Sequence, residues 1–146
     1  MSHPFDSAEL ALAFMLAGNA RLTAESLKTG VRYTYRIQVN PRELELPTDS
    51  RSWYVQLLQG RDNNSDFSYV GMIRRGRFFV TAATRNLEKA PFVRGLDYIV
   101  RHLWRGVLPP DAQLWHSSTC GRCGRALTVP QSIRTGIGPE CAKRMG

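Results

Sequence analysis

The sequence predicts an α+β fold in which a small antiparallel sheet is flanked by helices and followed by a cysteine-bearing C-terminal module. Three observations lead to this prediction. Residues 31–39 alternate apolar and polar side chains, which is typical of a half-buried strand. Residues 91–106 carry apolar side chains at helical spacing. All three cysteines of the chain lie close to its C-terminus.

The first predicted helix covers residues 10–16. Asp6 and Glu9 resemble a capping pair ahead of this apolar run, and Gly18 can end the helix in the left-handed conformation. Residues 20–26 can extend as a strand, and a turn leads from them to the strand at residues 31–39. The core face of that strand is predicted to carry five side chains: Val31, Tyr33, Tyr35, Ile37 and Val39.

Three further strands are expected at residues 53–59, 67–74 and 78–82. Prolines and acidic residues make a loop before the first of them, and a polar connection at residues 60–66 precedes the second. Alternation assigns Tyr33, Tyr35 and Trp53 to the core rather than to a base-stacking surface. The helix at 91–106 buries Phe92, Leu96, Ile99, Val100 and Leu103, and a proline-rich connector follows it at residues 108–111.

Cys120 and Cys123 form a Cys-x-x-Cys pair, and Cys141 follows at some distance. Gly121 and Gly124 allow a tight turn between the first two thiols. Structural zinc sites take four soft or borderline ligands in a tetrahedron, and Cys₃His sets are common among them. We therefore expect zinc, with His116 as the fourth ligand. His102 and a water molecule are alternatives for that position.

Two other interpretations of the cysteines explain the sequence less well. A redox pair of the thioredoxin kind opens a helix, whereas Gly124 would weaken a helix at once, and this interpretation leaves Cys141 and His116 without a role. A disulfide framework would leave one cysteine over. The first residues do not show a basic stretch followed by an apolar segment, which is the pattern of a signal peptide. We therefore expect reduced thiols and a cytoplasmic location.

The segment after the Cys-x-x-Cys pair predicts two short helices. Residues 130–134 can form one helical turn, and Pro139 suits the first turn of a second helix that would hold Cys141. A zinc knuckle combined with a ligand from a helix start resembles a treble-clef-like module. The chain is therefore expected to divide into an α+β domain at residues 1–110 and a zinc-binding module at residues 111–146.

Residues 120–141 also resemble an uncharacterised family of small zinc-motif proteins from bacteriophages, prophages and actinobacteria. The ending of that family reads CGRCGRxLTxPxSIxxGIGPxC, with a histidine upstream at the place of His116. The resemblance extends to residues 16–23, 29–37 and 62–71. It implies a zinc-bearing fold and a phage origin, hence the cytoplasm of a bacterial host, and it implies no particular activity.

Positive charge is concentrated in the second half of the chain. Residues 1–66 have a net charge of −1 and residues 67–146 one of +9, and 17 of the 20 basic residues are arginines. Arginine grips phosphate with a planar fork, so a polyanionic partner is favoured, nucleic acid first. The expected contacts lie around the cysteines and on the helix at 91–106: Arg122, Arg125, Arg134, Lys143, Arg144, Arg94, Arg101 and Arg105.

The remaining motifs restrict the choice of function. Residues 62–73 begin like a calcium loop but lack its glycine and its bidentate glutamate, and Gly136 and Gly138 are not followed by the Gly-Lys-Ser/Thr of a phosphate loop. No convincing catalytic set and no membrane-spanning run is present. The sequence thus predicts a non-enzymatic, zinc-containing protein that binds nucleic acid. The alternative is a protein that docks on a host defence or replication factor through the same arginines.

Overall fold

A seven-stranded antiparallel sheet forms the centre of the computed structural model, which describes residues 3–60 and 65–145. The strand order is β1-β7-β2-β3-β4-β5-β6. The strands are β1 (His3–Pro4), β2 (Asn19–Ser26), β3 (Arg32–Val39), β4 (Ser52–Leu58), β5 (Phe67–Arg74), β6 (Arg77–Phe79) and β7 (Ala112–His116). The polar connection expected at residues 60–66, with the calcium-loop pattern, lies largely outside the described residues.

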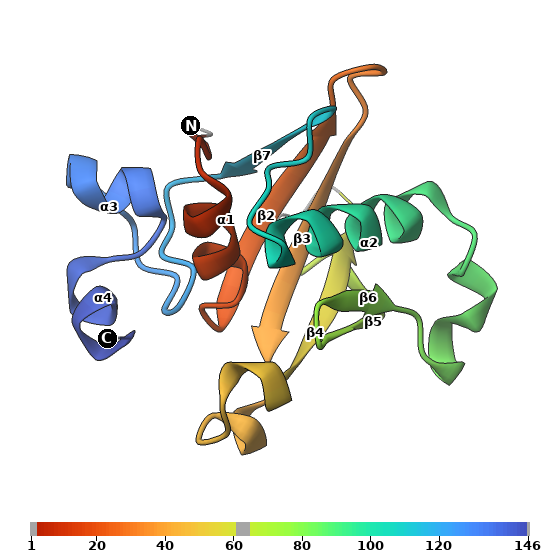
Figure 1. The fold of residues 1–146 in the computed structure, drawn as a ribbon, viewed down its shortest axis with the longest axis horizontal. Helices are drawn as coiled ribbons and strands as arrows, with labels where there is room; N and C mark the ends of the chain where they lie inside the picture. Colours follow the sequence, from red (N-terminus) through yellow and green to blue (C-terminus); the bar gives the residue numbers. More distant parts are fainter. Residues whose placement is uncertain (1–2, 61–64, 146) are drawn as a thin grey trace.

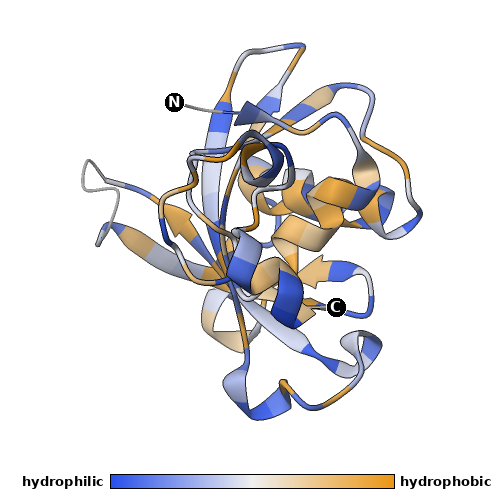
Figure 2. Cartoon of the chain, turned by 90° about the vertical axis from the view of Figure 1, so that its left-hand side faces the viewer, coloured by the Kyte–Doolittle hydropathy of each residue, from blue (hydrophilic) through white to orange (hydrophobic). Residues whose placement is uncertain are grey.

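Two helices, α1 (Ala8–Met15) and α2 (Pro91–Trp104), lie on one face of this sheet (Figure 1). Figure 2, turned by 90°, shows the helical part of the molecule on one side of the strands. The short helices α3 (Pro130–Thr135) and α4 (Pro139–Met145) lie beside α1 at one end of the sheet. Three 3₁₀ helices occupy loops: η1 (Pro41–Glu43), η2 (Thr48–Ser50) and η3 (Ala82–Leu87). The predicted α+β class with an antiparallel sheet and flanking helices is confirmed.

The core lies between the helices and the covered face of the sheet. Tyr35 and Trp53 are fully buried there, as the alternation predicted, and the polar atom of each side chain makes a hydrogen bond. The hydroxyl of Tyr35 donates a hydrogen bond to the carbonyl oxygen of Phe92 (2.6 Å), and the indole N–H of Trp53 donates to that of Leu16 (3.2 Å). Tyr33 is half-buried and its ring meets that of Phe92 edge-on. These bonds attach both covering helices to the sheet.

The structure differs from the prediction at several local positions. Ser7 caps α1, in place of Asp6, because its side chain accepts the Leu10 N–H (3.3 Å). Strand β6 is shorter than expected, and residues 82–87 turn into η3. Strands β1 and β7 were not predicted, since each is short and its pairing partners lie far away in the sequence.

Residue 110, the expected domain boundary, precedes β7, and β7 belongs to the common sheet. It pairs with β2 on one side, from Thr23↔Trp115 to Ser26↔Ala112, and with β1 on the other. The segment beyond β7 also packs against α1. A Cβ atom added at Gly121 or at Gly136 would lie 2.7 Å or 2.5 Å from Cδ1 of Phe14, so these two glycines form a slot for the Phe14 ring.

We predict that Gly121→Ala destabilises the whole chain by about 1–3 kcal/mol, because the new methyl group overlaps the Phe14 ring and the Phe14 carbonyl oxygen. Gly95→Ala on α2 is the matched control, since no atom lies within 4 Å of its added Cβ. That change should stabilise the helix by about 0.5–1 kcal/mol. Urea unfolding midpoints provide the comparison, and equal midpoints for the two variants would contradict the slot.

Candidate metal centre

The three thiols converge through a turn that the chain forms around Cys120. An isolated bridge pairs Thr119 with Ala126, and the backbone N–H of Cys120 donates to the carbonyl oxygen of Arg125 (2.8 Å). Gly124 closes the turn with a positive φ of 80° and donates to the Cys120 carbonyl oxygen (2.9 Å). A side chain at this φ is strained, so the glycine lets Cys120 and Cys123 point the same way.

Cys141 reaches this turn from the first turn of α4. Helix α3 ends at Gly136 with a φ of 75°, and the Gly136 carbonyl oxygen accepts the N–H of Gly121 (2.8 Å). This bond fixes the start of α4 beside the turn. The sulfur atoms of Cys120, Cys123 and Cys141 lie within 4.8 Å of one another. All three cysteines are free thiols, and the group can hold a metal ion.

The surroundings of the sulfurs favour a thiolate at Cys120. Burial alone raises the pKa of this thiol, but hydrogen bonds from the backbone N–H groups of Gly138, Cys123 and Arg122 outweigh it and bring the pKa to about 7. Two of these bonds, from Gly138 and Arg122, measure 3.3 Å and 3.4 Å. Such N–H to sulfur bonds stabilise the negative charge that a metal ligand must carry.

The pKa of Cys141 is shifted in the opposite direction to that of Cys120. Burial raises the pKa of Cys141, and the neighbouring Cys123 thiol raises it further. The side chain of Arg122 acts in the opposite direction through a hydrogen bond. Arg122, expected as a phosphate contact, is thus directed at least in part to the thiol group.

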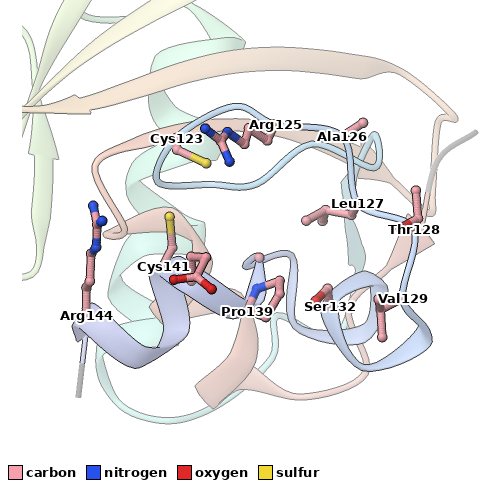
Figure 3. A pocket seen from close by; sticks show the side chains of 12 residues that line it. Cys123, Arg125, Ala126, Leu127, Thr128, Val129, Ser132, Pro139, Cys141 and Arg144 are labelled. Atoms are coloured by element: carbon pink, nitrogen blue, oxygen red, sulfur yellow. The ribbon is translucent and has the colours of Figure 1, made fainter.

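One side of the thiol group opens into a pocket of about 320 Å³, shown in Figure 3. Cys123 and Cys141 line it together with Arg125, Glu140 and Arg144. Cys123 is the exposed member of the three thiols, whereas Cys120 and Cys141 are buried. Solvent therefore reaches the sulfurs from the pocket side.

His116, the expected fourth ligand, is not in the group of converging ligand atoms found among the described residues. Its Nδ1 accepts the Ser118 N–H (3.1 Å) and its Nε2 donates to the Ile133 carbonyl oxygen. The ring is buried against those of Phe5 and Phe14. Burial lowers the pKa of His116, which keeps the imidazole neutral. The difference from the expectation arises because both ring nitrogens already have backbone partners. His102, the alternative, contacts the Tyr98 carbonyl oxygen on α2.

The basic residues expected to contact phosphate fall into two groups in the structure. Those around the thiols are exposed apart from the half-buried Arg122, and they share the C-terminal segment: Arg122, Arg125, Arg134, Lys143 and Arg144. Glu140 is the single acidic residue of the sequence after Asp111. The C-terminal segment is therefore strongly basic around the thiol group.

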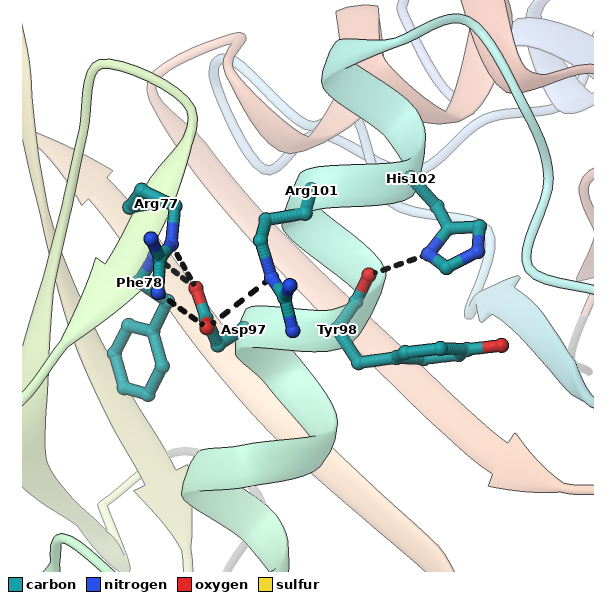
Figure 4. A network of polar contacts seen from close by, with 6 residues as sticks. All are labelled: Arg77, Phe78, Asp97, Tyr98, Arg101 and His102. Carbon is teal, nitrogen blue, oxygen red and sulfur yellow. Dashed lines mark hydrogen bonds and ion pairs between the residues drawn. The ribbon is translucent and has the colours of Figure 1, made fainter.

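The second group lies on α2, which covers the sheet. Arg94 and Arg105 are exposed, whereas Arg101 pairs with Asp97 (3.3 Å). Asp97 also accepts two hydrogen bonds from Arg77 and one from the backbone N–H of Phe78, as Figure 4 shows. Arg101 thus belongs to a charge network that ties α2 to β6, and the expected ridge of α2 contains a carboxylate.

A comparison with known protein families gives a match at the C-terminal segment. A family of unknown function, DUF6011, matches residues 115–146, which include the thiol group and His116. This supports the expected resemblance to an uncharacterised family. No curated protein and no solved structure matches the chain. In the described part of the chain, no helix is both long and apolar enough to cross a membrane.

We predict one metal ion per chain, and we expect Cys141→Ser to lower the content to near zero because the thiols converge on one point. His116→Gln should keep the metal, since its nitrogens face backbone groups. Elemental analysis of folded protein purified without added metal measures both. A wild-type content near zero would contradict the site, and loss of metal from His116→Gln would restore His116 as a ligand.

We further predict that removal of the metal by a chelator affects the C-terminal segment first. Amide hydrogen exchange should accelerate in residues 117–145, where the thiols make the long-range connection. Strand β7 should stay protected because it is paired on both edges. Equal loss of protection in β7 and in β3 would show instead that the chain unfolds as a single unit.

Proposed function

We propose that this is a non-enzymatic zinc protein that binds nucleic acid through the basic segment around its thiol group. The observation that carries the proposal is the charge of that segment: it has four exposed cationic side chains and the half-buried Arg122, against the single side-chain carboxylate of Glu140, and Arg125 and Arg144 line the pocket beside the thiols. Arg and Lys at such density favour the phosphate backbone of a nucleic acid. The metal would hold this short segment in one shape.

Zinc is the ion we propose for the site. Thiolates are its preferred soft ligands, and a Cys-x-x-Cys turn joined by a cysteine from a helix start gives a treble-clef-like arrangement. Cys141 is the one residue of α4 in the group of converging ligand atoms found among the described residues, and the positions after it carry the cations Lys143 and Arg144. We propose that a solvent molecule from the adjoining pocket completes the tetrahedron. A protein of this kind would act in the cytoplasm of a bacterial host and be encoded by a phage or prophage.

The alternative is docking on an acidic protein surface. Val129 and Met145 are exposed apolar residues within the same basic segment. Protein interfaces combine such apolar contacts with arginine, whereas contacts to a phosphate backbone need no exposed apolar side chain. This alternative therefore predicts binding that depends on Val129 and Met145 as well as on the arginines.

We predict that the affinity for nucleic acid falls steeply with salt, with a log–log slope of about −0.7 to −0.9 per phosphate contacted. Replacing Arg125, Arg134 and Arg144 together by Ala should weaken binding and flatten the slope, with the zinc content unchanged because none of them is a ligand. Replacing Arg94 and Arg105 tests whether α2 belongs to the same surface. Fluorescence anisotropy with single-stranded DNA, duplex DNA and RNA measures all of these.

Two results would decide between the proposals. Folded, metal-loaded protein that binds none of the three polymers at about 50 mM salt would contradict nucleic-acid binding. Capture of an acidic protein that the triple arginine variant fails to bind would then establish the alternative.

A further inference from the structure

The face of the sheet opposite the helices is a second polar and aromatic surface. Strand alternation places on it the residues between the core positions, and the pairing register arranges them in rows across the sheet. One row consists of Arg21, Arg36, Gln56 and Tyr69, and the next of Asn19, Gln38, Tyr54, Met72 and Phe79. A third joins Trp115, Thr23 and Thr34. We call this surface the open face.

The open face is accessible to solvent. Tyr54 and Phe79 expose 38% and 41% of their surface, whereas Trp53 and Val55, on the other side of the same strand as Tyr54, expose none. Tyr69 is half-buried, and its ring meets that of Tyr54 edge-on with the centroids 6.5 Å apart. Half-exposed aromatic rings in the middle of a sheet offer flat surfaces to a planar ligand.

Arginines stand at the centre of this face in an arrangement that favours an anion. Arg21 and Arg36 are direct cross-strand partners, and like charges in that position repel each other. Both guanidinium groups lie over the ring of Phe67, at 5.7 Å and 4.6 Å from its centroid. Burial lowers the pKa of Arg36, and the charge of Arg21 lowers it further. The Nε of Arg36 also donates a hydrogen bond to the Oε1 of Gln56 (2.7 Å), which fixes this guanidinium group on the open face.

The rest of the open face adds positive charge and hydrogen-bonding groups. Arg32 lies over the ring of Trp115 at 5.7 Å and pairs with Glu25 (3.1 Å). Three amides lie here: Gln38 Nε2 donates to Asn19 Oδ1 (3.3 Å), and Gln56 Oε1 accepts from Arg36 Nε (2.7 Å). Each amide has two donor hydrogens and an oxygen with two lone pairs, so these bonds do not use its whole capacity. The combination of arginine, half-exposed aromatic rings and amides suits phosphates, base faces and base edges at once.

The open face also continues into the basic segment around the thiols. The backbone N–H of Asn19, at the start of β2, donates to the Gly121 carbonyl oxygen (2.7 Å). A Cβ at Gly124 would lie 4.0 Å from the side-chain nitrogen of Asn19. The row that contains Gln38 and Tyr54 therefore begins beside the turn of Cys120 and Cys123. One strand of a nucleic acid could contact both the open face and the basic C-terminal segment.

We propose that the open face binds a single-stranded nucleic acid, with bases stacked on Tyr54 and Tyr69 and a phosphate held between Arg21 and Arg36. The proposal rests on the proposed function and extends it by naming the form of the nucleic acid and a second contact surface. A duplex hides its base faces, so stacking on this face requires unpaired bases. Stacking also tolerates any base, and the binding is therefore expected to depend little on sequence.

The test uses full-length, metal-loaded protein and fluorescein-labelled oligo(dT) and oligo(U) of about 12 nucleotides, with a duplex of equal length for comparison. Wild-type protein should bind the single strands more tightly than the duplex. The double variant Tyr54→Ala, Tyr69→Ala should bind the single strands about tenfold more weakly or worse, because each base–aromatic stack is lost. The double variant Tyr54→Phe, Tyr69→Phe keeps both rings and should retain the affinity.

Arg36→Gln tests the phosphate contact. It should reduce the salt slope by about one phosphate contact, whereas Arg85→Gln, an exposed arginine of η3 outside the rows, should leave the slope unchanged. Circular dichroism and metal content should match the wild type in every variant, which separates lost contacts from lost folding. Unaltered binding by the Tyr→Ala pair would overturn the proposal.

The possible outcomes distinguish this proposal from the proposed function. If the triple arginine variant of the C-terminal segment weakens binding while the Tyr→Ala pair does not, the proposed function stands and the open face is not a binding surface. If the Tyr→Ala pair alone weakens binding, the open face is the binding surface and the C-terminal arginines are not. Wild-type protein that binds no polymer contradicts both, and capture of a protein through Tyr54 and Tyr69 would overturn the nucleic-acid assignment.

Discussion

The structure depends on the pairing of β7 with β2. This antiparallel pair carries the chain back from the end of α2 into the sheet, from Ser26↔Ala112 to Thr23↔Trp115. His116 follows directly and is buried against the Phe14 ring. Phe14 in turn fills the slot between Gly121 and Gly136, so that a strand pair and one aromatic ring determine where the thiols lie. A cysteine-bearing segment too short to form its own core thereby gains a fixed position.

The same arrangement explains how the Cys120 thiolate is stabilised. Backbone N–H groups from two segments, at Arg122 and Gly138, converge on the Cys120 sulfur. Each segment provides one of these two hydrogen bonds to the thiolate. The hydrogen bond between Gly121 and Gly136 holds the two segments together. The geometry of the thiol group, the position of the C-terminal helices and the exposure of the nearby arginines therefore depend on one local structure.

Charge along the sequence and charge in space differ in this protein. The first half is nearly neutral overall, yet its strands β2 and β3 place Arg21, Arg32 and Arg36 on one face of the sheet. Its carboxylates lie mostly outside the strands, for example Glu43 in η1 and Asp49 in η2, and Glu25 of β2 pairs with Arg32 (3.1 Å). Conversely, Arg101 of the basic half is paired with Asp97. A surface that attracts anions can therefore arise from a segment with no net positive charge.

The sequence by itself determined the helix α2, the strands β2 to β5, the short helices α3 and α4, and the grouping of the three cysteines into one candidate metal site. Each of these features depends on local periodicity, on residues typical of helix starts or on ligand spacing. Tyr35 and Trp53 were correctly assigned to the core for the same reason. Tertiary structure alone decided the places of β1 and β7, the Phe14 slot and the surroundings of His116. Those features depend on contacts between residues far apart in the sequence, and no local pattern encodes which distant strand a short segment will pair with or which backbone groups will face a buried ring.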